Sequence, residues 1–259
     1  MTTVLVTGAA GLIGTFLRAS LPDLGWRLRC TDVRAAEGVQ TVDITSEQAL
    51  DEVVPGADAI VHLAAQPVEA PWPVIREANL EGCYQVFEAA RRHGVRRVVY
   101  ASSNHAVGLT PSEDELPATT PPRPDTLYGV SKVFGEALGR YYADRYGMQV
   151  ACLRIGTCAE KPPNVRALST WLSPGDCGRL VDACLRSDEL DYAIVWGVSA
   201  NKRRTWSLSE GNRLGYVPHD DAERFADTLA DANPRPSDRL VGGEFTTSHY
   251  GIDEVTARW

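Results

Sequence analysis

Three glycines near the N-terminus constrain the fold of this chain more than any other feature. They are Gly8, Gly11 and Gly14 in the stretch TGAAGLIG, and they stand three residues apart. An apolar run suited to a buried strand precedes them at residues 4–6, and apolar residues at helical spacing follow them. At such a turn the first glycine permits a tight bend, the second lets the backbone approach a pyrophosphate, and the third lets helix and strand pack closely. The stretch therefore predicts a dinucleotide-binding turn.

Strand-like apolar runs alternate with helical patterns along the rest of the chain. This alternation predicts βαβ units, and right-handed crossovers then give an α/β fold with a Rossmann-type doubly wound parallel sheet. Residues 104–126 and the chain beyond 232 show no such periodicity. The predicted strands are 4–6, 28–31, 59–63, 98–102, 150–155 and 192–196, and the predicted helices are 12–22, 73–92, 127–146 and 173–186.

We expect a single domain over residues 1–259. Residues 1–155 contain the glycine turn and most of the predicted strands, so they would mainly hold the cofactor. Residues 156–259 would finish the sheet and supply a small C-terminal substrate-binding portion.

An acid at the end of the second predicted strand favours NAD as the dinucleotide. Asp32 can accept hydrogen bonds from the adenosine ribose and would repel the 2′-phosphate of NADP. Arg34 leaves NADP open, because a cation two residues later could hold that phosphate. Asp43 and Ile44 have two interpretations: they could enclose the adenine, or they could belong to an ordinary surface turn.

Composition and charge exclude several classes of partner. The 259 residues carry a formal net charge of -8, which gives no basic footprint for nucleic acid and means that an anionic substrate needs a local cation. No apolar stretch approaches the roughly 20 residues that span a bilayer, and the N-terminus does not resemble a signal peptide. The six cysteines form no CxxC pair and lack zinc-type spacing. We therefore expect no metal, buried free thiols and a reducing cytoplasm.

Two short stretches carry groups suited to proton transfer. In SSNHAVG, Ser103, Asn104 and His105 follow a predicted strand, so they would emerge where open α/β sheets bind ligands. In YGVSK, Tyr128 and Lys132 stand four apart and therefore on one helical face. The ammonium favours the phenolate, which could take a proton from an alcohol while a hydride leaves its carbon. Without further support, His105 could equally be satisfied within its own loop.

These stretches give the chain a resemblance to a known family. With the glycine turn, HLAA at 62–65 and Asn79 with Gly82, they resemble the extended short-chain dehydrogenases/reductases, the NAD-dependent epimerase/dehydratase family. ASSNHAVG, RPDTLYGVSK, RIGTC, NVRALSTW and VWGVSAN are similar to the uronate dehydrogenases of that family, over nearly the whole chain. The resemblance implies NAD as cofactor and a hexuronic acid, glucuronate or galacturonate, oxidised at C1 to the aldarolactone.

The resemblance also implies residue roles. Tyr128 is the general base, Lys132 assists it, and Ser103 orients the reacting hydroxyl. Asn79 would line the cofactor but act as a structural or water-holding residue near Lys132 rather than as a direct ligand. The implied substrate contacts are Ser103, Asn104, His105, Thr157, Arg166 and the loop residue Pro67. The implied cofactor-lining residues are Gly8, Gly11, Leu12, Ile13, Gly14, Asp32, Asp43, Ile44, Leu63, Ala64, Ala65, Asn79, Tyr128, Lys132 and Ile155.

Arg166 is the implied clamp for the substrate carboxylate. A guanidinium fork fits a carboxylate with two parallel hydrogen bonds, each contributing roughly 1.5–3 kcal/mol. The alternative is an ordinary solvated arginine, which is how we interpret the run Lys202-Arg203-Arg204.

Pro67 departs from the family pattern, because we expect a serine at this position of the substrate loop. Proline offers neither a hydroxyl nor an N–H, and Gln66 is a candidate substitute. Trp171, Trp196 and Trp206 could stack on a sugar, but we assign them to the core.

Two alternative functions remain. A sugar-nucleotide 4-epimerase or dehydratase on the same scaffold would need a longer C-terminal lobe for a nucleotide diphosphate, which makes a small substrate the better fit. A non-catalytic NAD-sensing protein would not need Ser103, Tyr128 and Lys132 together. We also expect a homo-oligomer.

Overall fold

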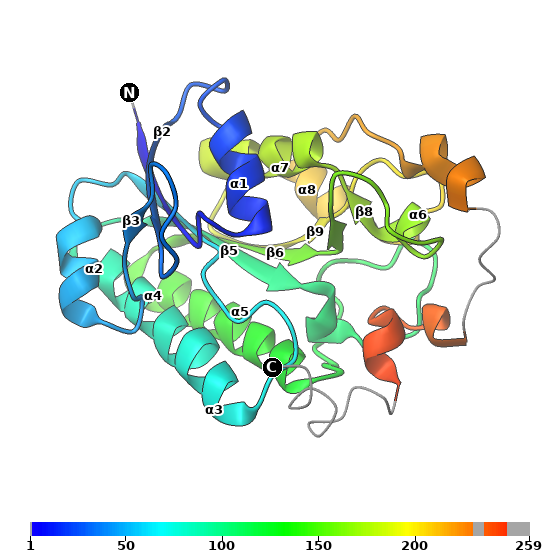
Figure 1. Cartoon of the computed structure of the whole chain (residues 1–259), viewed down its shortest axis with the longest axis horizontal. Coiled ribbons are helices and arrows are strands. Elements are labelled where there is room, and N and C mark those ends of the chain that lie inside the picture. Colours follow the sequence, from blue (N-terminus) through cyan, green and yellow to red (C-terminus); the bar gives the residue numbers. More distant parts are fainter. Residues whose placement is uncertain (1, 230–235, 248–259) are drawn as a thin grey trace.

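One sheet of seven parallel strands organises the molecule, and the computed structural model describes residues 2–229 and 236–247 (Figure 1). The strands lie in the order β3-β2-β1-β4-β5-β6-β9. The chain leaves β1 toward β2 and β3 and then crosses to β4 on the other side, so the strand order reverses beside β1. The strand bounds are β1 (Thr3–Thr7), β2 (Arg27–Asp32), β3 (Gln40–Thr41), β4 (Ala59–His62), β5 (Arg97–Ser103), β6 (Gln149–Ile155) and β9 (Tyr192–Gly197).

Helices cover both faces of the sheet (Figure 1). One face carries α1 (Leu12–Ser20) and α7 (Pro174–Arg186), and the other carries α2 (Glu47–Val53), α4 (Gly82–Arg92) and α5 (Leu127–Tyr146). The predicted helix 73–92 is built from α3 (Trp72–Ile75), a π-helical segment (Arg76–Glu81) and α4. The doubly wound parallel α/β fold is confirmed.

The hydrophobic core has two layers, one on each face of the sheet. Val4 and Val6 point into the layer under α1 and α7, whereas Leu5 points into the layer under α2, α4 and α5. Because both faces are covered, the central strands β1, β4 and β5 contain continuous apolar runs rather than alternating ones. Trp196 and Trp206 stack at 4.3 Å between ring centroids in a separate buried cluster, and Trp171 is also buried. Their assignment to the core agrees with the structure.

Local signals set the ends of the two longest helices. The Thr126 hydroxyl accepts a hydrogen bond from the Gly129 N–H at the start of α5, and Gly147 ends this helix with a left-handed φ of 63°. The Ser173 hydroxyl accepts a hydrogen bond from the Asp176 N–H and caps α7. The cap and stop residues in the sequence therefore fix these helices to within about a residue.

Several short elements are absent from the sequence prediction, because tertiary contacts rather than periodicity hold them. The segment 104–126, expected to be irregular, contains a 3₁₀ turn (Asn104–Val107), and the chain beyond 232 contains two more (Pro236–Arg239 and Gly243–Thr246). Residues 230–235 and 248–259 lie outside the described part. The other unpredicted elements are β3, α2, β7 (Thr157–Cys158), α6 (Ala167–Thr170), β8 (Trp171–Leu172), α8 (Ser209–Arg213) and a 3₁₀ segment (Ala222–Leu229).

A C-terminal strap, residues 240–246, packs back against the segment that follows β5. The Val241 N–H donates to the Thr110 carbonyl and the Gly242 N–H to the Gly108 carbonyl, both at 2.9 Å. The Asn104 side-chain amide donates to the Val241 carbonyl, also at 2.9 Å. The last described residues are therefore built into the region of SSNHAVG.

Over the described residues, no helix has the length and apolar character needed to traverse a bilayer.

Candidate active site

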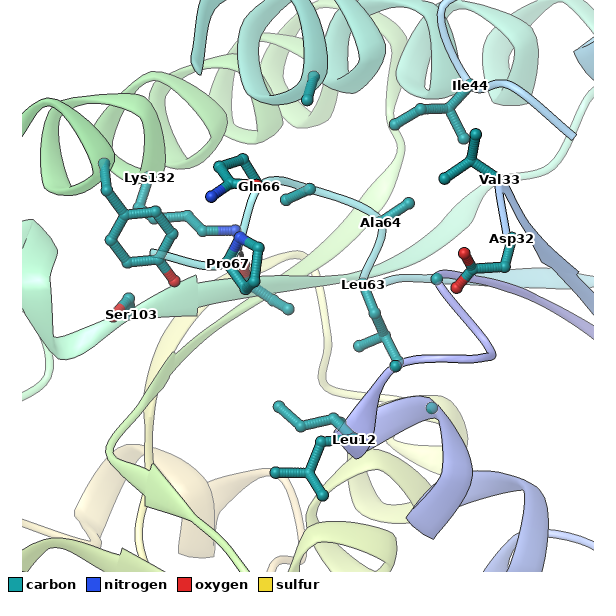
Figure 2. A pocket seen from close by; sticks show the side chains of 18 of the residues that line it. Leu12, Asp32, Val33, Ile44, Leu63, Ala64, Gln66, Pro67, Ser103 and Lys132 are labelled. Carbon is teal, nitrogen blue, oxygen red and sulfur yellow. Dashed lines mark hydrogen bonds between the residues drawn. The ribbon is translucent and has the colours of Figure 1, made fainter. Parts of the chain in front are cut away.

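A cavity of about 940 Å³ opens at the carboxyl ends of β1, β2, β4, β5 and β6, where the strand order reverses. Open α/β sheets bind ligands at such a point. In the view of Figure 2, Asp32, Val33 and Ile44 lie toward one end of the cavity, and Ser103, Lys132, Gln66 and Pro67 toward the other. The cavity lining includes Gly8, Gly11, Leu12, Ile13, Gly14, Asp32, Asp43, Ile44, Leu63, Ala64, Ala65, Pro67, Ser103, Tyr128, Lys132 and Ile155.

The glycine turn forms the floor of one end. Gly8 has a φ of +73°, and a Cβ at Gly14 would stand 2.5 Å from the Gly8 carbonyl oxygen, so a side chain there would force helix and strand apart. Helix α1 begins at this turn without a capping side chain or an acidic residue in its first turn. Its N-terminal amides and positive dipole end can therefore face an anion such as a pyrophosphate.

The Asp32 carboxylate is buried at the edge of the same end. One of its oxygens accepts the Ala10 N–H at 3.0 Å, and the other accepts the Arg34 N–H at 2.9 Å. These bonds fix the carboxylate in place, and each oxygen has a second lone pair that can face a ribose hydroxyl. The Arg34 side chain is 65% exposed beside it.

Asp43 closes a turn and also lines the cavity. Its carboxylate accepts the N–H and the hydroxyl of Thr45 at 2.9 and 2.8 Å, which makes a turn closed by a side chain. Asp43 and Ile44 also line the cavity.

The loop after β4 forms one wall of the cavity, and Asn79 holds it from behind. The Asn79 side chain accepts the Gln66 N–H at 2.7 Å and donates to the Gln66 carbonyl at 3.1 Å and to the Ser131 hydroxyl at 2.9 Å. Asn79 is buried and outside the cavity lining as the structure describes it. Its contacts are those of a structural residue that ties this loop to α5.

Ser103, Tyr128 and Lys132 converge from two elements. Ser103 ends β5, and the first two turns of α5 carry Tyr128 and Lys132. The Lys132 ammonium lies 5.4 Å from the centre of the Tyr128 ring and donates to the Ala101 carbonyl at 2.9 Å. The Ser103 hydroxyl lies close enough to the Tyr128 phenol to favour its charged form by hydrogen bonding. This cluster of a phenol, a hydroxyl and a cation is a candidate set for proton transfer.

Burial acts on both ionisable groups of this cluster. It raises the pKa of the Tyr128 phenol to about 12, while the hydrogen bond with Ser103 acts in the opposite direction. Burial also lowers the pKa of the Lys132 ammonium to about 8. Each shift disfavours the charged form. The protein alone therefore keeps Tyr128 as a neutral phenol near neutral pH, and an additional positive charge is needed to make it a base.

Four predicted substrate contacts lie outside the lining of this cavity in the described structure. Asn104 and Arg166 both donate to the Val241 carbonyl of the strap, and burial lowers the pKa of Arg166. The Thr157 and Thr170 hydroxyls share a hydrogen bond of 2.9 Å. His105 lies beneath the Phe245 ring, 4.2 Å between centroids. Asn104, His105 and Arg166 thus contact the strap, next to the cavity rather than in it, whereas Thr157 is held by Thr170.

Two acids that were not predicted from the sequence orient this cluster. The Asp125 carboxylate is fully buried and lies 2.7 Å from Nδ1 of His105. The Glu69 carboxylate accepts the Tyr128 N–H at 2.7 Å. Asp125 stands just before the helix that carries Tyr128, which was the available signal, whereas nothing in the local sequence marked Glu69. Both acids fix groups proposed for the chemistry.

The lining fits an extended dinucleotide. Uncapped helix amides and closely packed glycines suit a pyrophosphate, the Asp32 carboxylate suits a ribose, and the cavity continues to Tyr128 and Lys132. Within residues 2–229 and 236–247, no cluster of three histidine, cysteine or acidic side chains could hold a metal ion.

Comparison with known proteins agrees with this arrangement. Residues 4–159 match the model of the NAD dependent epimerase/dehydratase family. A uronate dehydrogenase from Pseudomonas syringae pv. tomato is 40% identical over 95% of this chain and 93% of its own length. An NAD-dependent glucose-6-phosphate dehydrogenase from Haloferax volcanii is 38% identical over 86% of this chain and 95% of its own length.

A solved structure shows that the similarity extends to the three-dimensional fold. The crystal structure of a mutant uronate dehydrogenase from Agrobacterium tumefaciens complexed with NAD has 40% sequence identity to this chain and a TM-score of 0.89. The match covers 95% of this chain and 97% of that one.

Proposed function

This chain belongs to the NAD dependent epimerase/dehydratase family, and we propose that it is an NAD-dependent uronate dehydrogenase. The predicted family and the predicted dependence on NAD are confirmed. The substrate needs its own argument, because similar relatives act on different sugars, one a uronate and another glucose 6-phosphate.

One observation carries the proposal. A single cavity has the glycine turn and Asp32 at one end and Ser103, Tyr128 and Lys132 at the other. This spacing supports a dinucleotide whose reactive ring lies beside a phenol and a hydroxyl. Residues 1–155 supply most of this lining, which supports our division between a cofactor portion and a smaller substrate portion, 156–259.

Oxidation of a cyclic hexuronate at C1 removes a proton from the hydroxyl oxygen and a hydride from the carbon, which leaves an aldarolactone. Tyr128 takes the proton in our proposal, and the Ser103 hydroxyl holds the same oxygen. Bound NAD accepts the hydride and brings a positive ring that favours the phenolate. Lys132 adds a second positive charge beneath the Tyr128 ring, 5.4 Å from its centre. The burial that raises the pKa of the phenol also excludes water from the proton transfer.

Arg166 is the proposed clamp for the substrate carboxylate. The side chains of Arg166 and Asn104 both donate to the Val241 carbonyl. Since Asn104 directly follows Ser103, the guanidinium lies near the proposed reacting groups. The bond to Val241 uses one of the five N–H donors of the guanidinium. Asn104, His105 and Thr157 are proposed contacts for the sugar hydroxyls. On a chain with a net charge of -8, this cation would favour an acidic sugar locally.

Compartment and assembly are further parts of the proposal. The six cysteines all lie within the described residues and are free, which supports a reducing cytoplasm. Tyr84 on α4 and Val130 and Tyr141 on α5 are exposed large apolar side chains. They support a homo-oligomer formed through these two neighbouring helices, which sedimentation at several protein concentrations would test.

The test is to mix the protein with NAD and each of several sugars and to follow NADH absorbance. We expect turnover with glucuronate or galacturonate and much less with glucose, galactose and glucose 6-phosphate. Preference for glucose 6-phosphate would reject the uronate assignment. Epimerised sugar nucleotide without net NADH would support the epimerase alternative, and NAD binding without turnover of any sugar would support a sensor.

Arg166→Ala tests the clamp. Loss of a charge-assisted hydrogen bond should lower kcat/KM for the uronate by about tenfold to a hundredfold, because such a bond contributes roughly 1.5–3 kcal/mol. Slow turnover of the neutral sugar should be nearly unchanged. Arg203→Ala is the matched control, since Arg203 is paired with Glu223 on the surface. Equal losses for both sugars would remove Arg166 from this role.

A further inference from the structure

The Gln66 side chain presents a buried amide nitrogen that has no hydrogen-bond partner. Among the described residues, its Nε2 atom is one of two buried side-chain nitrogens or oxygens in this condition. Gln66 also lines the cavity. A buried donor without an acceptor is unfavourable, and natural structures rarely keep one without a reason. The cavity is where an acceptor could come from.

The structure fixes the position of this amide relative to the reacting groups. Asn79 binds both the N–H and the carbonyl of the Gln66 backbone, at 2.7 and 3.1 Å. The same Asn79 amide donates to the Ser131 hydroxyl at 2.9 Å. Ser131 lies between Tyr128 and Lys132 on α5, and its hydroxyl donates to the Tyr128 carbonyl at 2.6 Å. Gln66 is thus tied through two hydrogen-bonded side chains to the turn of helix that carries the proposed base.

The side chains beside Gln66 cannot supply the same contact. Leu63, Ala64 and Ala65 have apolar side chains, and Pro67 lacks both a hydroxyl and an N–H. All four line the cavity beside Gln66. In the view of Figure 2, Gln66 lies with Ser103 and Lys132, toward the end opposite Asp32. The amide is therefore the polar group that this stretch of wall offers to a molecule bound near Tyr128.

We propose that the Gln66 amide nitrogen donates a hydrogen bond to a ring-hydroxyl oxygen of the sugar and so sets which sugar acids the site accepts. This inference rests on the proposed function and deepens it. A hydroxyl oxygen supplies the missing acceptor, and a neutral donor leaves the substrate carboxylate to the cation at Arg166. A sugar without that hydroxyl leaves the amide unpaired, so it binds and reacts more weakly.

Gln66→Met tests the proposal, because methionine keeps the length of the side chain and removes both N–H donors. Gln85→Met is the matched control: the Gln85 amide donates to Glu81 at 2.8 Å on the exposed surface of α4, outside the cavity. Each protein is assayed with NAD and glucuronate and with uronates that lack the hydroxyl at C2, C3 or C4. Affinity for NAD is measured in parallel by titration calorimetry.

One deoxy sugar should show coupling to Gln66. For the natural protein and for Gln85→Met, loss of that hydroxyl should lower kcat/KM by roughly threefold to tenfold, as expected for one hydrogen bond. For Gln66→Met, kcat/KM for the intact uronate should fall by a similar factor. Removal of the same hydroxyl from the sugar should then cause no further fall in kcat/KM. Affinity for NAD should stay within about twofold of the natural protein.

Independent effects of the variant and of every deoxy sugar would overturn the Gln66 proposal while leaving the uronate activity standing. An equal weakening of NAD binding would also overturn it, because the amide would then pair with the cofactor. Absence of uronate turnover by the natural protein would overturn the proposed function and this inference together.

Discussion

Lys132 on α5 and Arg154 on β6 are two buried cations on the same side of the molecule. Their side chains differ in the number and kind of hydrogen-bond partners. The Arg154 guanidinium binds both oxygens of Glu136 at 2.8 Å and donates to the carbonyls of Ala118 and Thr120. Among the described residues, the Lys132 ammonium makes one hydrogen bond, to the Ala101 carbonyl, and lies over two tyrosine rings.

The difference separates a structural charge from a functional one. A buried cation that is fully paired holds its neighbours in one arrangement. A buried cation without a carboxylate partner is costly, and burial accordingly lowers the pKa of Lys132 to about 8. In the proposed reaction, its electrostatic attraction would act on the negative charge that forms on the Tyr128 oxygen.

The largest expected effect is a split between activity and stability in Lys132→Met. Turnover should fall by roughly a hundredfold or more, the usual size of an acid–base contribution. The folded protein should gain up to about 3 kcal/mol near neutral pH, because the buried charge disappears.

Urea unfolding across pH measures the stability half of this prediction. The pKa of Lys132 is about 8 in the folded protein and 10.5 as its ordinary value, so the natural protein should gain stability as the pH rises between these values. The variant should lack that rise. A variant that is less stable than the natural protein would mean that Lys132 is a structural charge after all.

Arg154→Met should have the opposite result. Removing the guanidinium leaves the Glu136 carboxylate and two carbonyls buried without their donor, which should cost about 3–5 kcal/mol of unfolding free energy. Arg140→Ala on α5, the helix that carries Glu136, is the control, since the Arg140–Asp144 pair is more than half exposed and should contribute little to the free energy of unfolding. Equal free energies of unfolding for the two variants would contradict a structural role for the buried Arg154 charge.

His62 offers a smaller and more local test, because Lys132 acts on it. Burial, with a contribution from the Lys132 charge, lowers the pKa of His62 to about 3 from an ordinary 6.5. In this pH range His62 therefore binds a proton in the unfolded chain but not in the folded protein. The free energy of unfolding consequently decreases as the pH falls from about 6.5 toward 3. Between about pH 7 and pH 5 the loss should be near 2 kcal/mol, measured by urea unfolding, and His62→Asn should remove most of it.

The sequence predicted the parts of this molecule that local chemistry determines. The glycine turn, the apolar strands and the capped helices each carry a signal within a few residues, so the sheet, the cofactor end and the three residues Ser103, Tyr128 and Lys132 could be placed in advance. The family and its use of NAD followed from the same motifs.

The parts that could not be predicted depend on residues distant in the chain. The Glu69 carboxylate accepts a hydrogen bond from the Tyr128 N–H, 59 residues later in the sequence. The Asn104 amide donates to the Val241 carbonyl, 137 residues later. No periodicity encodes such a pairing, because only the finished fold brings the partners together. Gln66 could be named from the sequence as a candidate substitute at Pro67, but its unpaired amide could not, since only the fold shows that Asn79 binds its backbone.

The strap that binds Asn104 and Arg166 has a consequence for synthesis of the protein. The last strand of the sheet ends at Gly197, more than forty residues before Leu240, where the strap begins. On the ribosome, every strand of the sheet is therefore synthesised before the carbonyl that Asn104 and Arg166 share. If these two side chains bind the sugar as proposed, the chain acquires that part of its substrate site after the sheet that holds the dinucleotide.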